Sequence, residues 1–321
     1  MNWKIIRMLL PLVGVTIFVY IINSTGLGNI VDEVAKIPPL YLAGVVILSF
    51  PRVAVSTYKW RYIAKLQKMR MPYTYMLKVN FVGTFGGVVT PLGLGDFIRV
   101  PLIQKKSSER FAKCLANWLI DQAIEIFSLF LLAIVGTISL SLYFPEHRGL
   151  FIPVVTMFLI LLFIALLFIE NRRGKLLLGV ISKLILPEKY KNWLNDHLDA
   201  FYDEMPRVRS LLFPFSVEVF MYSFMFFQIY LIANVLGIKT PLPWFILLYA
   251  IASLIGQIPV TVSGLGTREG ALIGLFSLFN VQPHQIVAVS LVGYVVTMLV
   301  PAVTGAVLSF TLSNHKVKKR S

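Results

Sequence analysis

The chain has 321 residues, of which 57% are hydrophobic and 14% are charged, and its formal net charge is +15. Soluble domains are about 45–50% apolar and about 25% charged, so this composition excludes an ordinary soluble domain and indicates a polytopic membrane protein. In such a protein the positive charge reports topology, and no nucleic-acid partner is expected. A single cysteine excludes an internal disulfide, and the four histidines have no metal-ligand spacing.

Six apolar segments approach or exceed the roughly 20 residues that a helix needs to cross about 30 Å of hydrocarbon. In chain order they are Ile5–Ile22, Leu40–Trp60, Cys114–Leu142, Leu150–Ile169, Leu211–Leu236 and Ile286–Leu312. The first begins with Lys4 and Arg7 but is not followed by a small-residue cleavage site. We therefore interpret it as a retained span and not as a signal peptide.

Basic residues are distributed unevenly between the connections. Of the 30 basic residues, 23 can be assigned to the cytoplasmic side. They lie in the two termini, in the segment after the second span, and in the segments Arg99–Lys113 and Arg172–Arg209. The other connections contain at most one basic residue each. Because basic loops stay on the cytoplasmic side, this bias predicts a multi-pass protein of the cytoplasmic membrane with both termini in the cytoplasm.

The long basic connection 172–209 has apolar residues at helical spacing with lysines between them. One interpretation is an amphipathic helix that lies on the anionic lipid surface of the cytoplasmic leaflet. The other is a solvated linker with a helical turn.

The string Thr-x-x-Gly-Leu-Gly occurs twice, at Thr90–Gly95 and at Thr261–Gly266, 171 residues apart. Each copy interrupts an apolar stretch, Met76–Ile98 or Pro243–Asn280. The charge bias requires the first stretch to enter and leave from the cytoplasm and the second from outside. The first is too short for two crossings and is predicted to be a re-entrant hairpin, whereas the second fits either a hairpin or two crossings.

Paired interruptions that approach from opposite faces are typical of inverted repeats in transporters. The sequence therefore predicts one integral-membrane domain, 1–321, with repeat halves at about 1–142 and about 150–312. The predicted fold is all-α, with about six full transmembrane helices and two oppositely inserted, glycine-broken hairpins.

Unpaired backbone amides at a helix start attract phosphate or carboxylate groups. Asp96 is predicted to cap a half-helix whose first turn contains Arg99, and Thr267 to cap another that continues with Arg268 and Glu269. This pattern favours a pair of anion-binding helix ends near mid-membrane. The alternative is two helix breaks that serve only close packing.

Ionisable residues inside the spans also indicate a polar interior. Arg52 lies roughly 18 Å along its helix, and Asp121 and Glu125 share one face of theirs at similar depth. We predict that at least one of these carboxylates contacts Arg52 in some state of a transport cycle. A structural ion pair that fastens two helices is the alternative.

The sequence contains no P-loop, no histidine pair and no nucleophile elbow. We therefore expect no catalytic residues, no cofactor and no metal. The predicted substrate-binding residues are Arg52, Thr90, Pro91, Gly93, Gly95, Asp96, Arg99, Asp121, Glu125, Thr261, Gly264, Gly266, Thr267, Arg268 and Glu269.

The second glycine motif lies in a stretch, 258–270, that resembles the signature of the lysylphosphatidylglycerol synthase transmembrane, or flippase-like, family. Thr90-Pro91 with Gly95-Asp96 and Arg99 is similar to the first signature of that family, and Lys59-Trp60-Arg61 to its basic-Trp element. The likeness covers nearly the whole chain. One departure is Asp121-Gln122 with Glu125, where the family pattern implies an additional arginine.

The resemblance implies a protein like the flippase half of the multiple peptide resistance factor, without the soluble synthase domain. The leading hypothesis is translocation of a phosphate-bearing or polyprenyl-linked lipid across the cytoplasmic membrane. Its partners would be a lipid with an anionic headgroup and, where one exists, a lipid-modifying enzyme. The alternatives are a membrane subunit or enzyme of lipid glycosylation or aminoacylation, and a small-solute secondary transporter.

Overall fold

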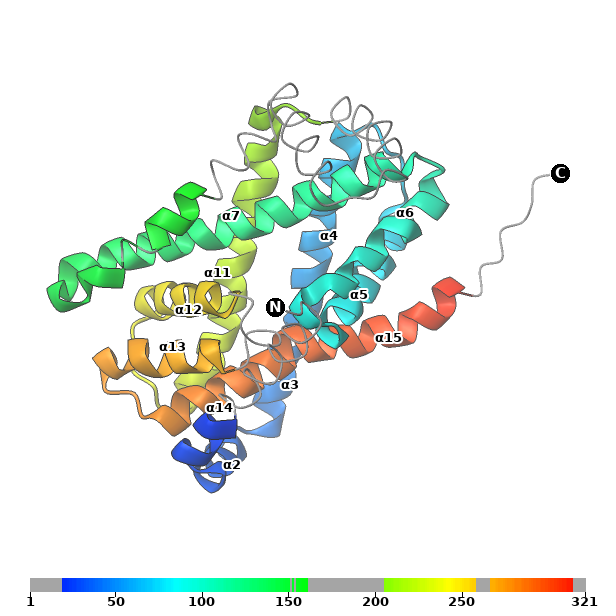
Figure 1. Ribbon diagram of the computed structural model, residues 1–321. Helices are drawn as coiled ribbons and strands as arrows, with labels where there is room; N and C mark the ends of the chain where they lie inside the picture. The colour runs from blue at the N-terminus through cyan, green and yellow to red at the C-terminus, as the bar shows by residue number, and fades with distance from the viewer. Residues whose placement is uncertain (1–18, 151, 153, 161–204, 258–265, 314–321) are drawn as a thin grey trace, which may run out of the picture.

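The computed structural model describes residues 19–150, 152, 154–160, 205–257 and 266–313 (Figure 1). Within these ranges every regular element is a helix, which confirms the predicted all-α class. Four of the helices are long and apolar enough to cross a membrane. The chain is therefore a polytopic helical membrane protein.

The four long helices cover Pro39–Leu66, Phe111–Tyr143, Val208–Val235 and Pro283–Thr311. They confirm four of the predicted spans, with ends that differ by a few residues. The largest difference is that α4 continues beyond Trp60, because Ile63 and Ala64 are also fully buried there. The predicted spans Ile5–Ile22 and Leu150–Ile169 lie mostly outside the described residues, as does most of the connection 172–209.

The long helices are built from several elements. They are α3 (Pro39–Ile47) with α4 (Ser49–Leu66); α7 (Phe111–Tyr143); η3 (Val208–Leu211) with α11 (Leu212–Val235); and α14 (Pro283–Tyr294), the π-helical η6 (Val295–Leu299) and α15 (Val300–Ser313). The shorter elements are α2 (Leu27–Ala35), α5 (Tyr73–Val89), η1 (Pro91–Ile98), α6 (Arg99–Ser107), η2 (Pro145–Leu150), α12 (Leu242–Gly256), α13 (Thr267–Phe276) and η5 (Ser277–Phe279).

Both glycine-containing stretches form pairs of packed helices. In the first, α5 is followed by η1 and α6, and α5 packs against both. In the second, α12 packs against α13. With 15 and 10 residues, α12 and α13 rise only about 22 and 15 Å, which is less than the roughly 30 Å of a hydrocarbon core. Neither helix is long enough for a full crossing.

Proline sets the start of several helices. Pro72 and Pro241 occupy the positions before α5 and α12, and Pro39 and Pro283 are the first residues of α3 and α14. Proline is tolerated there because the first amides of a helix have no intrahelical acceptor, and its fixed φ already suits the helix.

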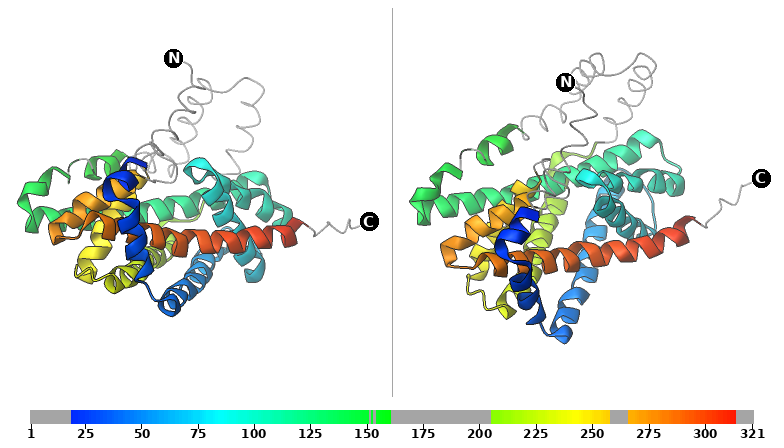
Figure 2. Two further views of the ribbon diagram at one scale, coloured as in Figure 1. Left: turned by 90° about the horizontal axis from the view of Figure 1, so that it is seen from below. Right: turned by 60° about the horizontal axis from the view of Figure 1, so that its bottom comes forward.

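Helices α4 and α11 run antiparallel through the centre of the molecule. At one end Gln228 donates a hydrogen bond to the Ser49 hydroxyl (2.7 Å), and toward the other end the rings of Tyr62 and Phe213 lie 4.9 Å apart. The α5–α6 hairpin and the α12–α13 hairpin lie on opposite sides of this pair (Figures 1 and 2). The two hairpins therefore approach the centre from two sides.

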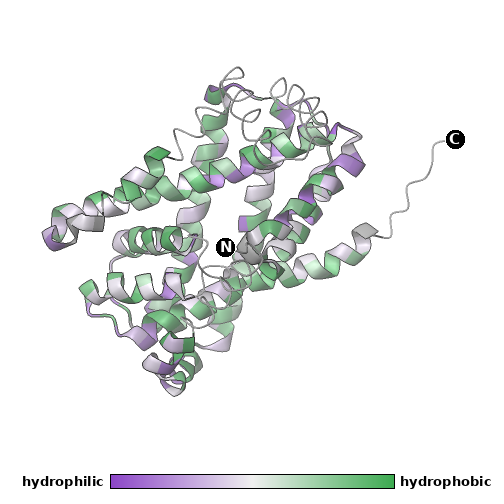
Figure 3. Cartoon of the chain, in the orientation of Figure 1, coloured by the Kyte–Doolittle hydropathy of each residue, from purple (hydrophilic) through white to green (hydrophobic). Residues whose placement is uncertain are grey.

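Each hairpin has its own apolar core. The larger core joins α11, α12, α13 and α14, and the smaller one surrounds Trp60 with residues of α5 and α6. Figure 3 shows mostly apolar ribbon in the long helices, interrupted by hydrophilic patches on α4 and α7. These patches carry the charged residues described below.

Candidate substrate-binding cavity

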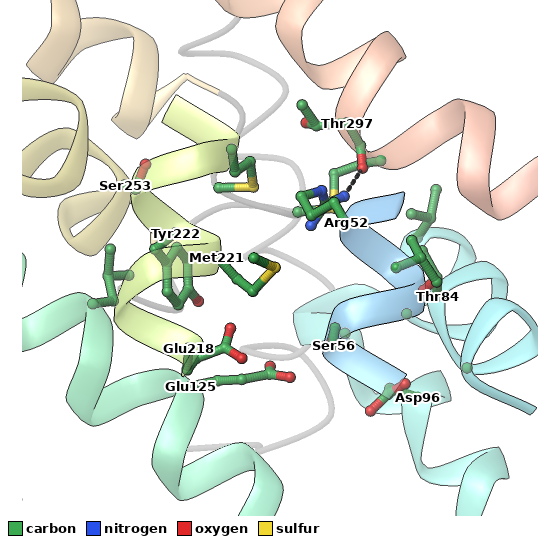
Figure 4. Close-up of a pocket in the computed structure, with 18 of the residues that line it drawn as sticks. Arg52, Ser56, Thr84, Asp96, Glu125, Glu218, Met221, Tyr222, Ser253 and Thr297 are labelled. Carbon is green, nitrogen blue, oxygen red and sulfur yellow. Dashed lines mark hydrogen bonds between the residues drawn. The ribbon is translucent and has the colours of Figure 1, made fainter. Parts of the chain in front are cut away.

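A cavity of about 510 Å³ lies between the two hairpins. Its wall is formed by α4, α5, η1, α6, α7, α11, α12, α13, α14 and the π-helical η6 (Figure 4). The ionisable residues that line it are Arg52, Asp96, Arg99, Glu125, Glu218, Tyr222, Tyr249, Arg268 and Tyr294. The volume falls within the range of about 300–1,000 Å³ that is usual for small-molecule sites.

The turn of the first hairpin is held by side-chain and backbone contacts. The Thr90 hydroxyl donates to the carbonyl of Gly86 (2.8 Å) and accepts the N–H of Gly95 (2.6 Å). A β-carbon on Gly95 would collide with the backbone of Gly86, and one on Gly86 would collide with the backbone of Gly95. Gly95 is therefore required for close packing of two backbone segments. This agrees with the alternative interpretation of the sequence, in which the helix break serves close packing.

We expect Gly95→Ala to destabilise the protein by about 1–3 kcal/mol, because overpacking forces the hairpin apart. Gly274→Ala is the matched control, since Gly274 is an exposed residue of α13 with no atom within 4 Å of its added β-carbon. The control should be neutral or slightly stabilising. Thermal unfolding of both variants in detergent measures the difference, and equal stability would contradict the packing role.

Asp96 does not cap a helix, which corrects the prediction from sequence. The return segment begins as 3-10 helix at Pro91, and α6 starts at Arg99 after Ile98. The Asp96 carboxylate instead accepts hydrogen bonds from side chains, namely Arg99 Nε (2.6 Å), a terminal nitrogen of Arg99, Trp118 Nε1 (2.9 Å) and Gln122 Nε2 (3.2 Å). A charged guanidinium three residues away is a better partner for the carboxylate than the amides of a tight 3-10 turn.

Lys59 lies at the centre of a buried ion cluster. Its ammonium is 2.8 Å from Asp121 Oδ1, 2.7 Å from Glu218 Oε2 and 3.7 Å from Glu125 Oε1. Arg99 approaches Asp121 from another direction at 3.1 Å and lies over the ring of Trp60. We call Lys59, Arg99, Asp96, Asp121, Glu125 and Glu218 the Lys59 cluster. It joins α4, η1, α6, α7 and α11.

The predicted contact between Arg52 and an acidic residue of α7 is absent from this structure. Arg52 instead donates a hydrogen bond to the carbonyl of Thr297 (2.5 Å), and among the described residues no carboxylate lies within ion-pair distance of it. The reason is that Lys59 follows Arg52 by seven residues, about two turns, and so occupies the same face of α4. It reaches the carboxylates of α7 first.

The second hairpin carries an internally paired charge. The Glu269 carboxylate accepts the N–H of Gly266 (2.6 Å) and the hydroxyl of Ser290 (2.8 Å), and it binds Arg268 (2.8 Å). Gly266 occupies the cap position with φ of 92°, and Thr267 is the first helical residue. Thr267 is therefore not the cap. A glycine is needed there because an L side chain rarely adopts that φ.

The structure brings together part of the predicted site. Six of the predicted residues line the cavity: Arg52, Gly93, Asp96, Arg99, Glu125 and Arg268. Seven lie outside the cavity lining. Thr90, Pro91, Gly95 and Gly266 form or flank the turns, Thr267 starts α13, and Asp121 and Glu269 are buried behind the wall. Thr261 and Gly264 are outside the described residues.

Two important residues were not among the predicted site residues. Lys59 is fully buried, and Glu218 is 7% exposed. The available signal was their position inside apolar spans, where an ionisable group is costly and indicates a function or a partner. Among the described residues, no group of His, Cys, Asp and Glu is arranged to hold a metal ion.

The fold and the cavity define a polytopic helical membrane protein with a charged cavity between two hairpins. Residues 8–305 match the family described as the lysylphosphatidylglycerol synthase TM region, and the chain belongs to this family. This region is the membrane part of the synthase and not its catalytic domain.

Archaeal relatives are similar over nearly their whole length. A UPF0104 membrane protein of Methanothermobacter thermautotrophicus is 23% identical over 300 residues, which cover 88% of this chain and 89% of the relative. A second protein of the same name from that organism is 21% identical, with 93% and 91% covered. A UPF0104 membrane protein of Methanocaldococcus jannaschii is 23% identical, with 100% and 99% covered.

Proposed function

We propose that this protein translocates a phosphate-bearing lipid between the leaflets of the cytoplasmic membrane. The observation that carries the proposal is Arg52. It lines the cavity, and among the described residues it is the cation of the cavity wall that lacks a carboxylate partner. Arg99 is bound by Asp96 and Asp121, and Arg268 by Glu269.

An arginine in this setting suits a phosphate. The guanidinium has five N–H donors in a planar fork, and the carbonyl of Thr297 accepts from one terminal nitrogen. The remaining donors match two oxygens of a phosphate, and a charge-assisted bidentate contact of this kind is strong. The cavity would hold the headgroup while the acyl or prenyl tails remain in the hydrocarbon, because exposed apolar side chains cover the outer surface of the long helices.

The proposed membrane topology follows the charge bias and the helix lengths. It consists of six spans with both termini in the cytoplasm, and the hairpins enter from opposite faces as an inverted repeat. The lengths of α12 and α13 favour a re-entrant hairpin for the second stretch. Lys65 lies in the last turn of α4 and Lys239 follows α11. They lie at opposite ends of the antiparallel α4–α11 pair, so the topology puts them on opposite sides of the membrane.

Reconstitution with matched lipid probes tests the function. The full chain is placed in phosphatidylcholine vesicles that contain a trace of phosphatidylglycerol or phosphatidylcholine, each with the same fluorophore on one acyl chain. Dithionite in the outer solution destroys only fluorophores that reach the outer leaflet. We expect the phosphatidylglycerol probe to be bleached beyond its outer-leaflet fraction, and faster than the phosphatidylcholine probe.

Protein-free vesicles and a trapped water-soluble dye control for leakage. If neither lipid probe crosses faster than in protein-free vesicles, the proposal fails. Phosphatidylcholine has the same phosphodiester but a headgroup with no net charge, so equal rates for the two probes would contradict selection of an anionic headgroup. Release of a small trapped anion without lipid exchange would favour a small-solute transporter.

A further inference from the structure

The charges around the cavity do not balance. The Arg268–Glu269 pair of the second hairpin is neutral overall, so the remaining groups decide the balance. The described cations of that remainder are Arg52, Lys59 and Arg99, and the described carboxylates are Asp96, Asp121, Glu125 and Glu218. A phosphate that enters would add a further negative charge beside a group of buried and cavity-lining charges in which carboxylates already outnumber cations.

Three of the four carboxylates are well compensated. Asp121 contacts both Lys59 and Arg99, and Asp96 is held by Arg99 together with two neutral N–H donors. Glu218 lies 2.7 Å from the ammonium of Lys59. Each of these groups has a close positive partner that stabilises its charged form.

Glu125 is the exception. Its nearest cation is Lys59 at 3.7 Å, an ammonium that Asp121 and Glu218 already approach more closely. Its side chain is 28% exposed and lines the cavity, so a proton can reach it from water there. Figure 4 shows Glu125 and Glu218 side by side, on the part of the cavity that faces away from Thr297.

We infer that Glu125 is a proton-binding site and that a phosphate-bearing lipid and a proton occupy the cavity together. The inference rests on the proposed function and adds proton coupling to it. A proton from the cavity water binds one carboxylate oxygen of Glu125, and the neutral acid then no longer repels the phosphate at Arg52. By linkage the phosphate favours the proton to the same degree as the proton favours the phosphate.

Few other groups can respond to pH in this place. The ionisable groups in the cavity wall or the Lys59 cluster around Glu125 are Arg52 and Lys59 on α4, Asp96 on η1, Arg99 on α6, Asp121 on α7 itself, Glu218 and Tyr222 on α11, Tyr249 on α12, Arg268 on α13 and Tyr294 on α14. No histidine is among the described residues that line the cavity. Ordinary tyrosines, lysines and arginines titrate above about pH 10, and ordinary carboxylates below about pH 5. A transition near neutral pH would therefore point to a carboxylate in an unusual environment.

The test follows exchange of the phosphatidylglycerol probe from about pH 5.5 to about pH 8.5, a window in which ordinary Asp and Glu are ionised. The phosphodiester of the probe keeps its charge throughout this window, so any pH dependence belongs to the protein. We expect the rate of the wild-type protein to fall with rising pH, by up to about tenfold per pH unit, the limit for a single proton site.

Glu125→Gln imitates the protonated acid and should exchange the probe at a rate that varies less than twofold over the same window. Glu109→Gln is the matched control, because Glu109 is 30% exposed and pairs with a single lysine, Lys113, away from the cavity. It should follow the wild-type profile. If Glu125→Gln also follows the wild-type profile, the inference is wrong.

A second measurement uses only the wild-type protein. With an acidic outer solution and an alkaline lumen, movement of the lipid together with a proton should enrich the probe in the inner leaflet, and dissipating the gradient should abolish the enrichment. Exchange that responds neither to pH nor to the gradient would overturn proton coupling while the proposed function stands. Absence of exchange at every pH would overturn the proposed function, and the inference with it.

Discussion

Replacing Lys59 with methionine is expected to destabilise the protein severely. The ammonium of Lys59 is fully buried and lies within 4 Å of three carboxylates. Methionine fills a similar volume but removes the charge, so Asp121, Glu125 and Glu218 would be left close together in a region of low dielectric. Breaking a buried ion pair by removing one partner typically costs about 3–5 kcal/mol, and here three acidic groups lose the same partner. Thermal unfolding in detergent measures the loss.

The double variant Lys59→Met/Glu218→Gln tests whether unpaired carboxylates cause the loss of stability. Neutralising Glu218 removes one of the unpaired carboxylates, so the double variant should be more stable than Lys59→Met alone. Two residues that do not interact would not show this coupling between their effects on stability. Lys65→Met on the same helix is the control, because Lys65 is exposed and should change stability by less than about 0.5 kcal/mol. If the control and Lys59→Met unfold at the same temperature, the Lys59 cluster does not stabilise the fold.

The spans could be predicted from sequence because the bilayer imposes a length. Cys114–Leu142 was expected, and α7 covers Phe111–Tyr143. The hydrocarbon core excludes charged residues, so the ends of an apolar run mark the ends of the crossing to within a turn. The duplicated glycine motif likewise indicated where helices break, and residues from both hairpins line one cavity.

Side-chain partners could not be predicted in the same way. Depth along a helix placed Arg52 level with the acidic pair of α7, but depth does not specify which residue of α4 meets α7. Lys59 lies on the same face, and its position opposite Glu218 depends on how α4 and α11 pack. That packing is a property of the whole bundle and leaves no local pattern in the sequence.

Turn chemistry was ambiguous for a related reason. Asp96 and Thr267 are both common cap residues, and the sequence offers each of them an exposed helix start. In the structure Asp96 is bound by Arg99, while Glu269 takes the amide of Gly266. Arg99 brings a full positive charge to Asp96, and the carboxylate of Glu269 binds the amide at the helix start more strongly than the neutral hydroxyl of Thr267 could.

Replacing Arg52 should abolish most lipid exchange while leaving the protein folded. Arg52→Gln removes the charge that the phosphate is proposed to meet, and a hydrogen bond to a charged group contributes about 1.5–3 kcal/mol, so exchange of the phosphatidylglycerol probe should fall by about 10–100-fold. Arg52→Lys keeps a positive charge but loses the planar fork, and its rate should lie between those of the wild-type protein and Arg52→Gln.

Stability separates this prediction from the one for Lys59. Because Arg52 has no carboxylate partner in the described structure, Arg52→Gln strands no buried anion and should unfold close to the wild-type temperature. Arg70→Gln, at an exposed arginine outside the cavity, controls for the loss of one positive charge from the chain. Normal probe exchange by a folded Arg52→Gln protein would show that Arg52 does not receive the phosphate. If Arg52→Gln loses as much stability as Lys59→Met, Arg52 stabilises the fold. In that case its charge is already compensated within the protein, and it is not available to bind the phosphate.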